Sequence, residues 1–472
     1  MPGMGSLADI TPPIALGALD GRYRAAVAPL VDHLSEAALN RARVHVEIEW
    51  LIHLTDRRVV PGVRQLTETE IARLRAIVAE FGADDIAELA EIERETVHDV
   101  KAVEYYLKRR MPDILGEDSE QLAELVHFCC TSEDINNLCY ALMVKGAVQT
   151  VWLPKAEDLL EQLAALAAEH AEVPMLSRTH GQAATPTTLG KELAVSVHRL
   201  RRQVRRVAAT DFLGKLNGAT GTYGAHVAAV PEANWPAISN TFVTDRLGLT
   251  WNPLTTQIES HDWQAELYSD VARFNRILHN LCTDVWTYIS LGYFAQVRGQ
   301  GTVGSSTMPH KVNPIRFENA EANLEVSNAL FDVLSSTLVQ SRMQRDLTDS
   351  SMQRNIGTAF GHGMLALDNV CRGLAGLDAV PAQMAADLDG NWEVLGEPIQ
   401  SAMRALGAQG FGGMENPYER LKELTRGRRI DGDDLREFVR GLGLPTEVEQ
   451  RMLDLTPQTY VGLAPELARR HL

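Results

Sequence analysis

Hydrophobic residues recur at three- and four-residue steps along three long segments of the chain. This spacing places apolar side chains on one side of a helix. The surrounding residues are rich in Ala, Leu, Glu and Arg, which favour helix, whereas alternating strand patterns are scarce. We therefore predict an all-α protein in which long helices pack as a bundle. The recurring positions are Leu159, Leu160, Leu163 and Leu166; Leu189, Leu193, Val197, Leu200, Val204 and Val207; and Leu330, Val333, Leu334, Thr337 and Leu338.

Glycine and proline interrupt the helical pattern at several places. Met111-Pro112-Asp113 predicts a break in the first helical region, and residues 215–236 predict an irregular excursion inside the second. The length of 472 residues corresponds to roughly three domains of about 150 residues. We predict three helical domains, which are an N-terminal domain over 1–120, a central long-helix bundle over 121–372 and a C-terminal domain over 373–472.

The composition is that of an ordinary globular protein, with 45% hydrophobic and 23% charged residues. No segment reaches the roughly 18 uninterrupted apolar residues that a membrane helix needs. The N-terminus has neither the basic nor the apolar region of a secretory signal. Five cysteines, an odd number that includes the adjacent Cys129-Cys130, indicate reduced thiols rather than a disulfide framework. We expect a cytoplasmic protein that does not bind a membrane.

The net charge of -17 argues against a nucleic-acid surface, because binding to a duplex needs a broad positive face. A phosphorylated metabolite remains compatible with this charge, since one phosphate needs only a few local arginines. The chain has no HExxH, no paired CxxC and no EF-hand loop. We therefore predict no metal site and no cofactor.

The segment 304–314, GSSTMPHKVNP, combines several groups that could bind an anion. It contains the hydroxyls of Ser305 and Ser306, the ammonium of Lys311 and the amide of Asn313. The glycines that precede it predict a mobile flap that closes over a substrate. Composition alone would favour a surface loop. Residues 299–304 also match GxGxxG, but no βαβ alternation surrounds them, so we do not predict a dinucleotide site.

Three further clusters carry candidate chemistry, and each has a plain structural alternative. His180, in SRTHGQ, is flanked by glycine and could act as a general acid or base, or simply pack or cap. Thr131-Ser132, in TSEDINN, predicts a helix N-cap, and helix N-termini also hold carboxylates. Ser350 and Arg354 would share a helical face and, with the less well aligned Arg345, could clamp a phosphate or form a charged surface.

These motifs, in this order, resemble the signatures of the fumarase/aspartase lyase superfamily. The resemblance extends from about Leu16 to Thr456-Pro457 and includes segments besides those above. At the position of His310, fumarases and aspartases usually carry Gly and argininosuccinate lyases Gln. His310 therefore makes the chain resemble the branch that cleaves adenylosuccinate, and ELTRG at 423–427 is typical of the long bacterial form of that branch. The further segments are WNP at 251–253, TTQIE at 255–259, QRDLTD at 344–349 and ELTRG at 423–427.

The resemblance implies three all-α domains and a homotetramer in which central helices of four subunits form a twenty-helix core. Each active site would take segments from three subunits. The implied reaction is β-elimination of fumarate from adenylosuccinate, which gives AMP, and from the succinylated imidazole carboxamide ribotide. The implied partners are therefore purine nucleotide substrates and other copies of the chain.

The reaction needs a base beside a carboxylate, a pocket for the second negative charge that develops there, and an acid for the departing nitrogen. By resemblance, Ser305 is the base and His180 is the acid, oriented by Glu318. Lys311 and Asn313 would bind the succinyl carboxylates. The resemblance assigns further substrate contacts to Thr131, Ser132 and Ser306 at the carboxylates, to Gln257 at the succinyl or base region, to Arg22, Tyr23, His98, Asp99, Arg345, Ser350 and Arg354 at the phosphate and ribose, and to Asn319.

Two alternatives remain. One is a lyase of the same fold that acts on argininosuccinate or aspartate, against which His310 and the Arg345, Ser350 and Arg354 set argue. The other is a non-catalytic structural tetramer, against which the intact serine, histidine, lysine and glutamate positions argue. The chain departs from the family pattern at Val97, where Asn is common, and in a longer insertion over 407–414.

Overall fold

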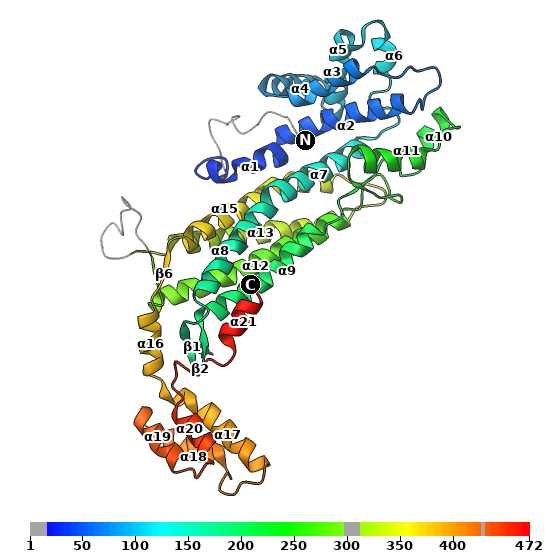
Figure 1. Cartoon of the computed structure of the whole chain (residues 1–472). Coiled ribbons are helices and arrows are strands. Elements are labelled where there is room, and N and C mark those ends of the chain that lie inside the picture. The colour runs from blue at the N-terminus through cyan, green and yellow to red at the C-terminus, as the bar shows by residue number, and fades with distance from the viewer. Residues whose placement is uncertain (1–16, 297–311, 426–429) are drawn as a thin grey trace. The chain divides into compact units, whose positions relative to one another are not determined.

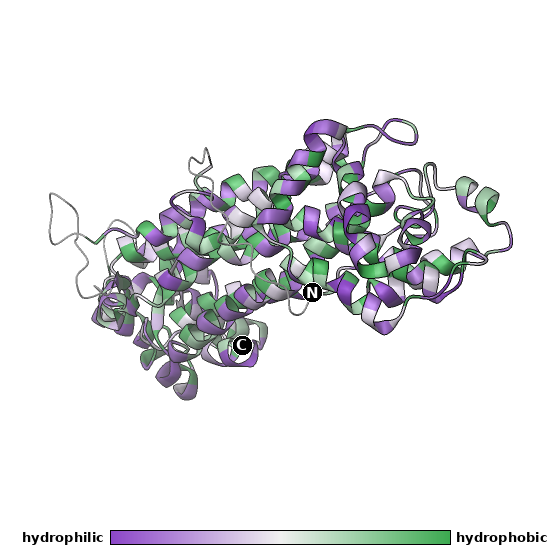
Figure 2. Cartoon of the chain, turned by 90° about the horizontal axis from the view of Figure 1, so that it is seen from above, coloured by the Kyte–Doolittle hydropathy of each residue, from purple (hydrophilic) through white to green (hydrophobic). Residues whose placement is uncertain are grey.

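The computed structural model describes residues 17–296, 312–425 and 430–472 of the chain. Helices make up most of these residues, and the strands among them are short and pair two by two (Figure 1). Individual helices carry hydrophobic and hydrophilic residues together, as amphipathic packing requires (Figure 2). The prediction of an all-α protein built from long helices is confirmed.

The chain forms two compact units, and each unit combines three separate stretches of sequence. Long helices return repeatedly along a bundle, so residues far apart in sequence pack together. The division into three domains at residues 120 and 372 stays a prediction. The first unit comprises Met1–Glu157, Gln203–Arg276 and Ala322–Asp368, and the second comprises Asp158–Arg202, Ile277–Glu321 and Asn369–Leu472.

Helix α2 (Glu36–Asp56) lies at the centre of the first unit, where it packs against α1, α3, α5 and α7. Ser35 begins the helix by accepting the Ala38 N–H at 3.0 Å. Because neighbours cover α2 on several sides, even its charged residues Arg43 and Glu47 are buried. The other helices of this unit are α1 (Arg24–Leu34), α3 (Glu68–Ala79), α4 (Ala83–Thr96), α5 (Asp99–Leu115), α6 (Ser119–Ala123), α7 (Ser132–Ala147), α10 (Gly224–Ala229), α11 (Trp235–Thr241) and α14 (Thr348–Gln353), with the short turns η1 (Gly116–Asp118), η2 (Val148–Trp152) and η3 (Phe242–Arg246) and the parallel strands β3 (Leu213–Gly214) and β4 (Thr250–Trp251).

The predicted apolar stripes fall on long helices. On α9 every stripe residue from Leu189 to Val207 is buried, as expected. On α13 the helix is confirmed. Val333 is 42% exposed while Leu334 and Leu338 are buried, so Val333 does not belong to the buried face. The long helices are α8 (Leu153–Glu169), α9 (Leu189–Ala208), α12 (Asp262–Ser290), α13 (Ile315–Leu338) and α15 (Ile356–Leu374).

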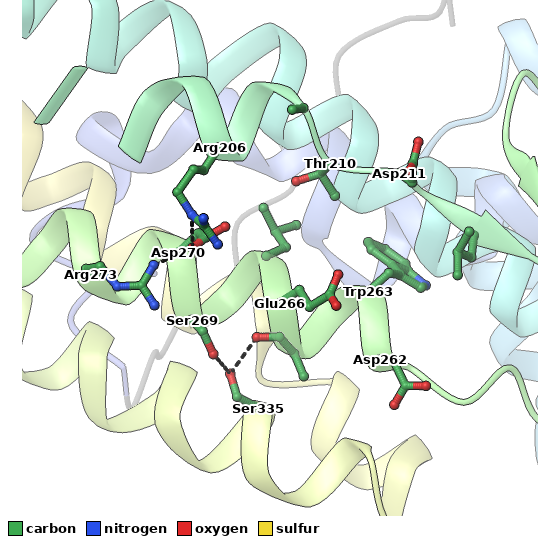
Figure 3. Close-up of a pocket in the computed structure, with 14 residues that line it drawn as sticks. Arg206, Thr210, Asp211, Asp262, Trp263, Glu266, Ser269, Asp270, Arg273 and Ser335 are labelled. Atoms are coloured by element: carbon green, nitrogen blue, oxygen red, sulfur yellow. Dashed lines mark hydrogen bonds and ion pairs between the residues drawn. The ribbon is translucent and has the colours of Figure 1, made fainter. Parts of the chain in front are cut away.

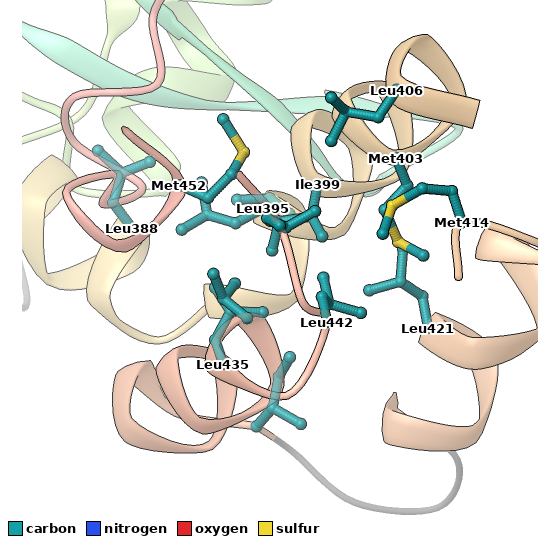
Figure 4. Packing of buried hydrophobic residues seen from close by; sticks show 14 of the residues in the cluster. Leu388, Leu395, Ile399, Met403, Leu406, Met414, Leu421, Leu435, Leu442 and Met452 are labelled. Carbon is teal, nitrogen blue, oxygen red and sulfur yellow. The ribbon is translucent and has the colours of Figure 1, made fainter. Parts of the chain in front are cut away.

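The second unit contains a β-hairpin and a separate C-terminal core. Leu395, Ile399, Met403, Leu435 and Met452 form part of this core (Figure 4). The insertion at 407–414 ends α17 and returns Met414 to the same core. The elements are β1 (Pro174–Thr179) and β2 (Gln182–Thr188), β5 (Phe294–Gln296) and β6 (Leu377–Ala379), α16 (Pro381–Asp389), η4 (Trp392–Leu395), α17 (Gly396–Ala408), α18 (Pro417–Thr425), α19 (Gly432–Arg440), α20 (Thr446–Leu453) and α21 (Ala464–Arg470).

The predicted break at Met111-Pro112-Asp113 is wrong. Helix α5 passes through Pro112 and ends only at Leu115, where Gly116 takes a φ of 62°. Proline removes one backbone hydrogen bond, but here this happens in the last turn of the helix. Met111 and Leu115, in the same turn, are buried, so packing of this end of the helix favours its continuation past the proline.

Across the described ranges, no helix combines the length and the apolar content needed to span a membrane.

Val97 follows α4 in a conformation that its side chain disfavours. Its φ of 51° and ψ of 30° are left-handed, and its side chain is 88% exposed. A β-branched residue is strained in this region, whereas Asn enters it readily. The left-handed backbone at the end of α4 therefore explains why a residue such as Asn suits this position.

We expect Val97→Asn to raise the free energy of unfolding by about 1 kcal/mol, because it relieves left-handed strain without removing a packed side chain. Urea denaturation measures this change. Val227→Asn is the matched control, because Val227 is 51% exposed but lies inside helix α10. An equal gain in both variants would contradict the backbone explanation.

Candidate active site

The N-termini of α5 and α7 bring two predicted substrate-binding residues together. His98 is the N-cap of α5, and its Nδ1 accepts the N–H of Lys101 at 3.2 Å. Its Nε2 lies 3.5 Å from Oγ of Ser132, the first residue of α7. The N-cap predicted at Thr131 is confirmed, because α7 begins directly after it. Free N–H groups at such helix starts favour anions.

Asp99 lies between two arginines in the same unit. Its Oδ2 is 2.6 Å from Nη2 of the buried Arg43 and 3.5 Å from Nη2 of Arg354. Burial of the carboxyl group favours its neutral form, but the charge of Arg43 and its hydrogen bonds outweigh this and lower the pKa of Asp99. Arg354 also contacts both oxygens of Glu36, at 2.6 and 2.7 Å. These carboxylates fix the guanidinium of Arg354 at the surface.

Arg345 and Gln257 also contact each other. Nη1 of Arg345 donates to Oε1 of Gln257 at 3.1 Å, and its Nη2 lies 3.0 Å from Oε1 of the buried Glu133. The amide of Gln257 donates in turn to the carbonyl of Ala219 at 2.8 Å. Arg345 is therefore oriented by two partners.

A cavity of about 260 Å³ adjoins Arg354 and is lined in part by Asp20 and Glu36. Arg22 and Tyr23 follow Asp20 in the chain, and the Arg22 guanidinium lies 5.8 Å from the Tyr23 ring centroid. Ser350 lies on α14, which ends directly before Arg354. The first unit thus contains the predicted residues Arg22, Tyr23, His98, Asp99, Thr131, Ser132, Gln257, Arg345, Ser350 and Arg354.

The second unit presents His180 at the tip of the β1–β2 hairpin. His180 and Gly181 have φ values of 52° and 76°, as a two-residue hairpin turn with left-handed residues requires. The side chain of His180 is exposed. Two residues before His180, Arg178 pairs with Asp387 at 2.5 Å, and Tyr293 donates to the same carboxylate. The imidazole of His180 is therefore exposed at the tip of a hairpin that Asp387 fixes, where a substrate can reach it.

The remaining predicted residues of this unit lie around the start of α13. Glu318 is exposed and accepts the indole N–H of Trp286 at 3.2 Å, so its orientation of His180 stays a prediction. Asn313 is exposed just before α13, and Asn319 accepts from Asn369 at 2.9 Å. The flap and the GxGxxG match, with Ser305, Ser306, His310 and Lys311, lie outside the described residues.

The sequence did not single out several residues that organise this site. Asn136 accepts from Nε of Arg43 at 2.9 Å and donates to Glu133 at 3.0 Å. This relay connects the partner of Asp99 with the partner of Arg345. Glu133 and Asn136 stand inside the TSEDINN motif, which was a usable signal. Arg43 gave none, because it looks like any charged residue of an amphipathic helix.

A second cavity, of about 810 Å³, lies elsewhere in the first unit, between α9, α12 and α13 (Figure 3). Asp270 there pairs with Arg206 at 2.8 Å and with Arg273 at 2.5 Å. The lining also includes Asp211, Asp262 and Glu266, so acidic groups outnumber basic ones. This cavity is unsuited to an anionic substrate, and none of the predicted site residues lines it.

Among the described residues, no group of three or more His, Cys, Asp or Glu side chains could hold a metal ion. The cysteines of this part are all free, and burial raises the pKa of Cys129 to about 11. A thiol with such a pKa is protonated at neutral pH and is a poor metal ligand or nucleophile.

Comparisons with known proteins agree with this arrangement. Residues 21–326 match a family described as Lyase, and residues 341–461 match one described as Adenylosuccinate lyase C-terminal. The adenylosuccinate lyase of Escherichia coli strain K12 is 48% identical over 450 residues, which cover 95% of this chain and 97% of that protein. That of Vibrio cholerae is 46% identical over 456 residues, covering 96% and 98%.

Solved structures share the fold at low identity. A fumarate lyase from Mesorhizobium superposes with a TM-score of 0.73 at 18% identity, covering 94% of this chain and 96% of that one. The 3-carboxy-cis,cis-muconate lactonizing enzyme of Pseudomonas putida has a TM-score of 0.69 at 20% identity, with coverage of 93% and 97%. Fold and site thus define a lyase built from long helices. Within that class, the chain belongs to the adenylosuccinate lyase family.

The loop before α7 is held by a buried carboxylate. Oε1 of Glu47 lies 2.6 Å from Nδ1 of His127, and Oε2 accepts the His127 N–H at 3.0 Å. Burial opposes the charge on the imidazole, but the hydrogen bond and charge of Glu47 outweigh it and raise the pKa of His127. His127 takes a φ of 59°, a value that Asn tolerates well.

We expect the stability difference between the wild type and His127→Asn to depend on pH. A raised pKa in the folded state stabilises the protein below the unfolded value of about 6.5, and this contribution is lost as pH rises through the folded pKa. The difference in unfolding free energy should therefore be largest near pH 6 and smaller at pH 9. Urea titrations at both pH values measure it. A difference that grows with pH would show that the pair is not charged.

Proposed function

We propose that this carbon–nitrogen lyase eliminates fumarate from adenylosuccinate to give AMP, and from the succinylated aminoimidazole carboxamide ribotide. The observation that carries the proposal is the 48% identity to an adenylosuccinate lyase over 95% of the chain. Identity at this level extends through both the N-terminal and the C-terminal matched families. The substrate class follows from the relatives, and the site supplies groups that suit it.

The arginines of the first unit support a phosphorylated substrate. Arg354 is held by Glu36 and Asp99, and Arg345 by Glu133 and Gln257, which orients each planar group for further N–H donation. Arg22 is exposed and lies two residues after Asp20, which lines the cavity beside Arg354. A substrate such as aspartate has no phosphate and would leave the remaining N–H donors of these arginines unused.

The start of α7 supports binding of a succinyl carboxylate. Thr131 and Ser132 offer hydroxyls where the unpaired N–H groups of the helix also point. Lys311 and Asn313 would complete the pocket from the signature segment. Together these groups would stabilise the second negative charge that develops on the carboxylate when the adjacent proton leaves.

Ser305 would remove that proton, and His180 would protonate the departing nitrogen of the purine. The exposed position of His180 at a rigid hairpin tip suits delivery of a proton to a bound substrate. Glu318 would orient the imidazole. A serine needs strong activation to serve as a base, and the ammonium of Lys311 would supply it when the segment covers the substrate.

We also propose a homotetramer in which the central bundle, residues 121–372, forms the shared core and three subunits complete each site. Val326 and Val333 support this assembly, because they are 45% and 42% exposed and lie seven positions apart on one face of α13. Apolar side chains on a long helix face are favourable when another copy covers them. The proposed location is the cytoplasm.

We expect the purified protein to release fumarate and AMP from adenylosuccinate without added metal or cofactor. Chromatography of the products measures this reaction. A parallel assay with argininosuccinate and with aspartate is the control for substrate class, and both should give no product. Turnover of either control, or none of adenylosuccinate and the ribotide, would overturn the proposal.

We expect His180→Ala and Ser305→Ala each to lower kcat by about 10²- to 10⁴-fold, the range for a general acid or base. Size-exclusion chromatography should show the same oligomer as for the wild type, because His180 is exposed and each change removes only a small polar group. Ser177→Ala, in the β1 strand of the same hairpin, is the control and should keep its kcat. Wild-type rates in both site variants would refute the assigned roles.

A further inference from the structure

A fully buried ion pair lies at the first turn of α7. Nζ of Lys215 is 2.9 Å from Oδ1 of Asp134, and neither side chain has any exposed area. Asp134 is the third residue of α7, whereas Lys215 directly follows strand β3. Neither residue has a role in the reaction as proposed above. Buried ion pairs add little net stability over apolar residues, so a pair at this place calls for another explanation.

The carboxylate of Asp134 joins two segments that are far apart in sequence. Its Oδ2 accepts the N–H of Thr131 at 2.9 Å and that of Gly218 at 3.1 Å. Its Oδ1 accepts the N–H of Asn217 at 2.9 Å, in addition to the ammonium of Lys215. The N-cap of α7 and the loop after β3 therefore share one carboxylate.

The loop after β3 is itself fixed by other contacts. Asn137 accepts the N–H of Lys215 at 2.8 Å and donates to its carbonyl at 3.0 Å. The amide of Asn217 donates to Oγ1 of Thr255 at 2.8 Å. Gly221 has a φ of 74°, and a Cβ there would lie 2.1 Å from the Thr255 carbonyl oxygen, so only glycine permits this approach. The loop is thus a rigid support for Asp134.

We propose that Lys215 is a positioning residue, which holds Thr131 and Ser132 in place and keeps the start of α7 attractive to a substrate carboxylate. The inference rests on the proposed function, in which these two residues bind the succinyl group. An unneutralised Asp134 would place a negative charge one turn from the bound dicarboxylate. That charge would oppose the positive potential of the helix N-terminus. The ammonium of Lys215 cancels it from inside the protein.

The test compares two products that occupy different halves of the site. Fumarate reports on the carboxylate half, and AMP reports on the phosphate half held by Arg345 and Arg354. We expect Lys215→Met to weaken fumarate binding by about tenfold, the change that follows from loss of one charged contact. The inhibition constant of AMP should stay within about twofold of the wild-type value, since Arg345 keeps its contact with Gln257 and Arg354 its contact with Glu36, and neither partner lies on α7. Inhibition kinetics and calorimetry measure both constants.

Lys215→Gln is the second variant, because it keeps a hydrogen-bond donor without the charge. It should also weaken the binding of fumarate more than that of AMP, and it replaces the methionine variant in the test if that variant does not fold. Arg75→Met is the structural control. It removes the nearer cation, at 2.7 Å, of another buried carboxylate, that of Glu49, which Arg246 also approaches at 3.8 Å. The Arg75–Glu49 pair joins α3 to α2 and does not support α7. Arg75→Met should lower the unfolding midpoint and leave the ratio of the two inhibition constants unchanged.

Equal weakening of fumarate and AMP, or no change in either, would overturn the positioning role. A changed ratio in Arg75→Met would do the same, because general destabilisation would then suffice. The wild-type assay separates this inference from the proposed function. A wild type that cleaves adenylosuccinate while Lys215→Met keeps its ratio refutes the inference alone, whereas an inactive wild type refutes the proposed function.

Discussion

The candidate site depends on carboxylates that are neutralised by buried cations. Asp134 with Lys215 and Asp99 with Arg43 are two such pairs, and they lie at the first turns of α7 and α5. Asp134, Lys215 and Arg43 are buried, and a charge without a partner in such positions would cost several kcal/mol. The pairs therefore tie the helix starts to the segments that supply their cations. The two helix N-termini keep their positions because their own acidic residues are satisfied from inside.

This arrangement explains how an acidic chain can bind an anionic substrate. The net charge of -17 describes the whole surface, but salt screens it over about 8–10 Å. At the site, Arg43 and Lys215 cancel the nearest carboxylates. Arg345 and Arg354, which Glu133 and Glu36 hold in place, then present their remaining N–H groups at shorter range than any distant acidic residue. Local pairing, rather than total charge, sets the sign of the potential that a phosphate would meet.

Much of the fold could be predicted from the sequence, because the spacing of hydrophobic residues within a short segment indicates a helix. The stripe on α9 was correct at every position, since one buried face repeats through the whole helix. Val333 was assigned wrongly to a buried stripe, because spacing cannot say which of two adjacent apolar residues faces the core. The hairpin of His180 was missed for a related reason. Its strands are short and polar, and its turn uses a histidine in a conformation that composition does not predict.

The site was only partly predictable, and the difference lies in sequence separation. Thr131 and Ser132 could be located because an N-cap is a local feature. Their supports could not, since Lys215 lies 81 positions beyond Asp134 and reaches it only through the packing of the bundle. A residue that contacts substrate can be suggested from its side-chain type alone. A residue that positions another is recognised only by the contact between them, and a contact between distant segments exists only after the chain has folded. Positioning residues are therefore the part of an active site that a structure adds to a sequence.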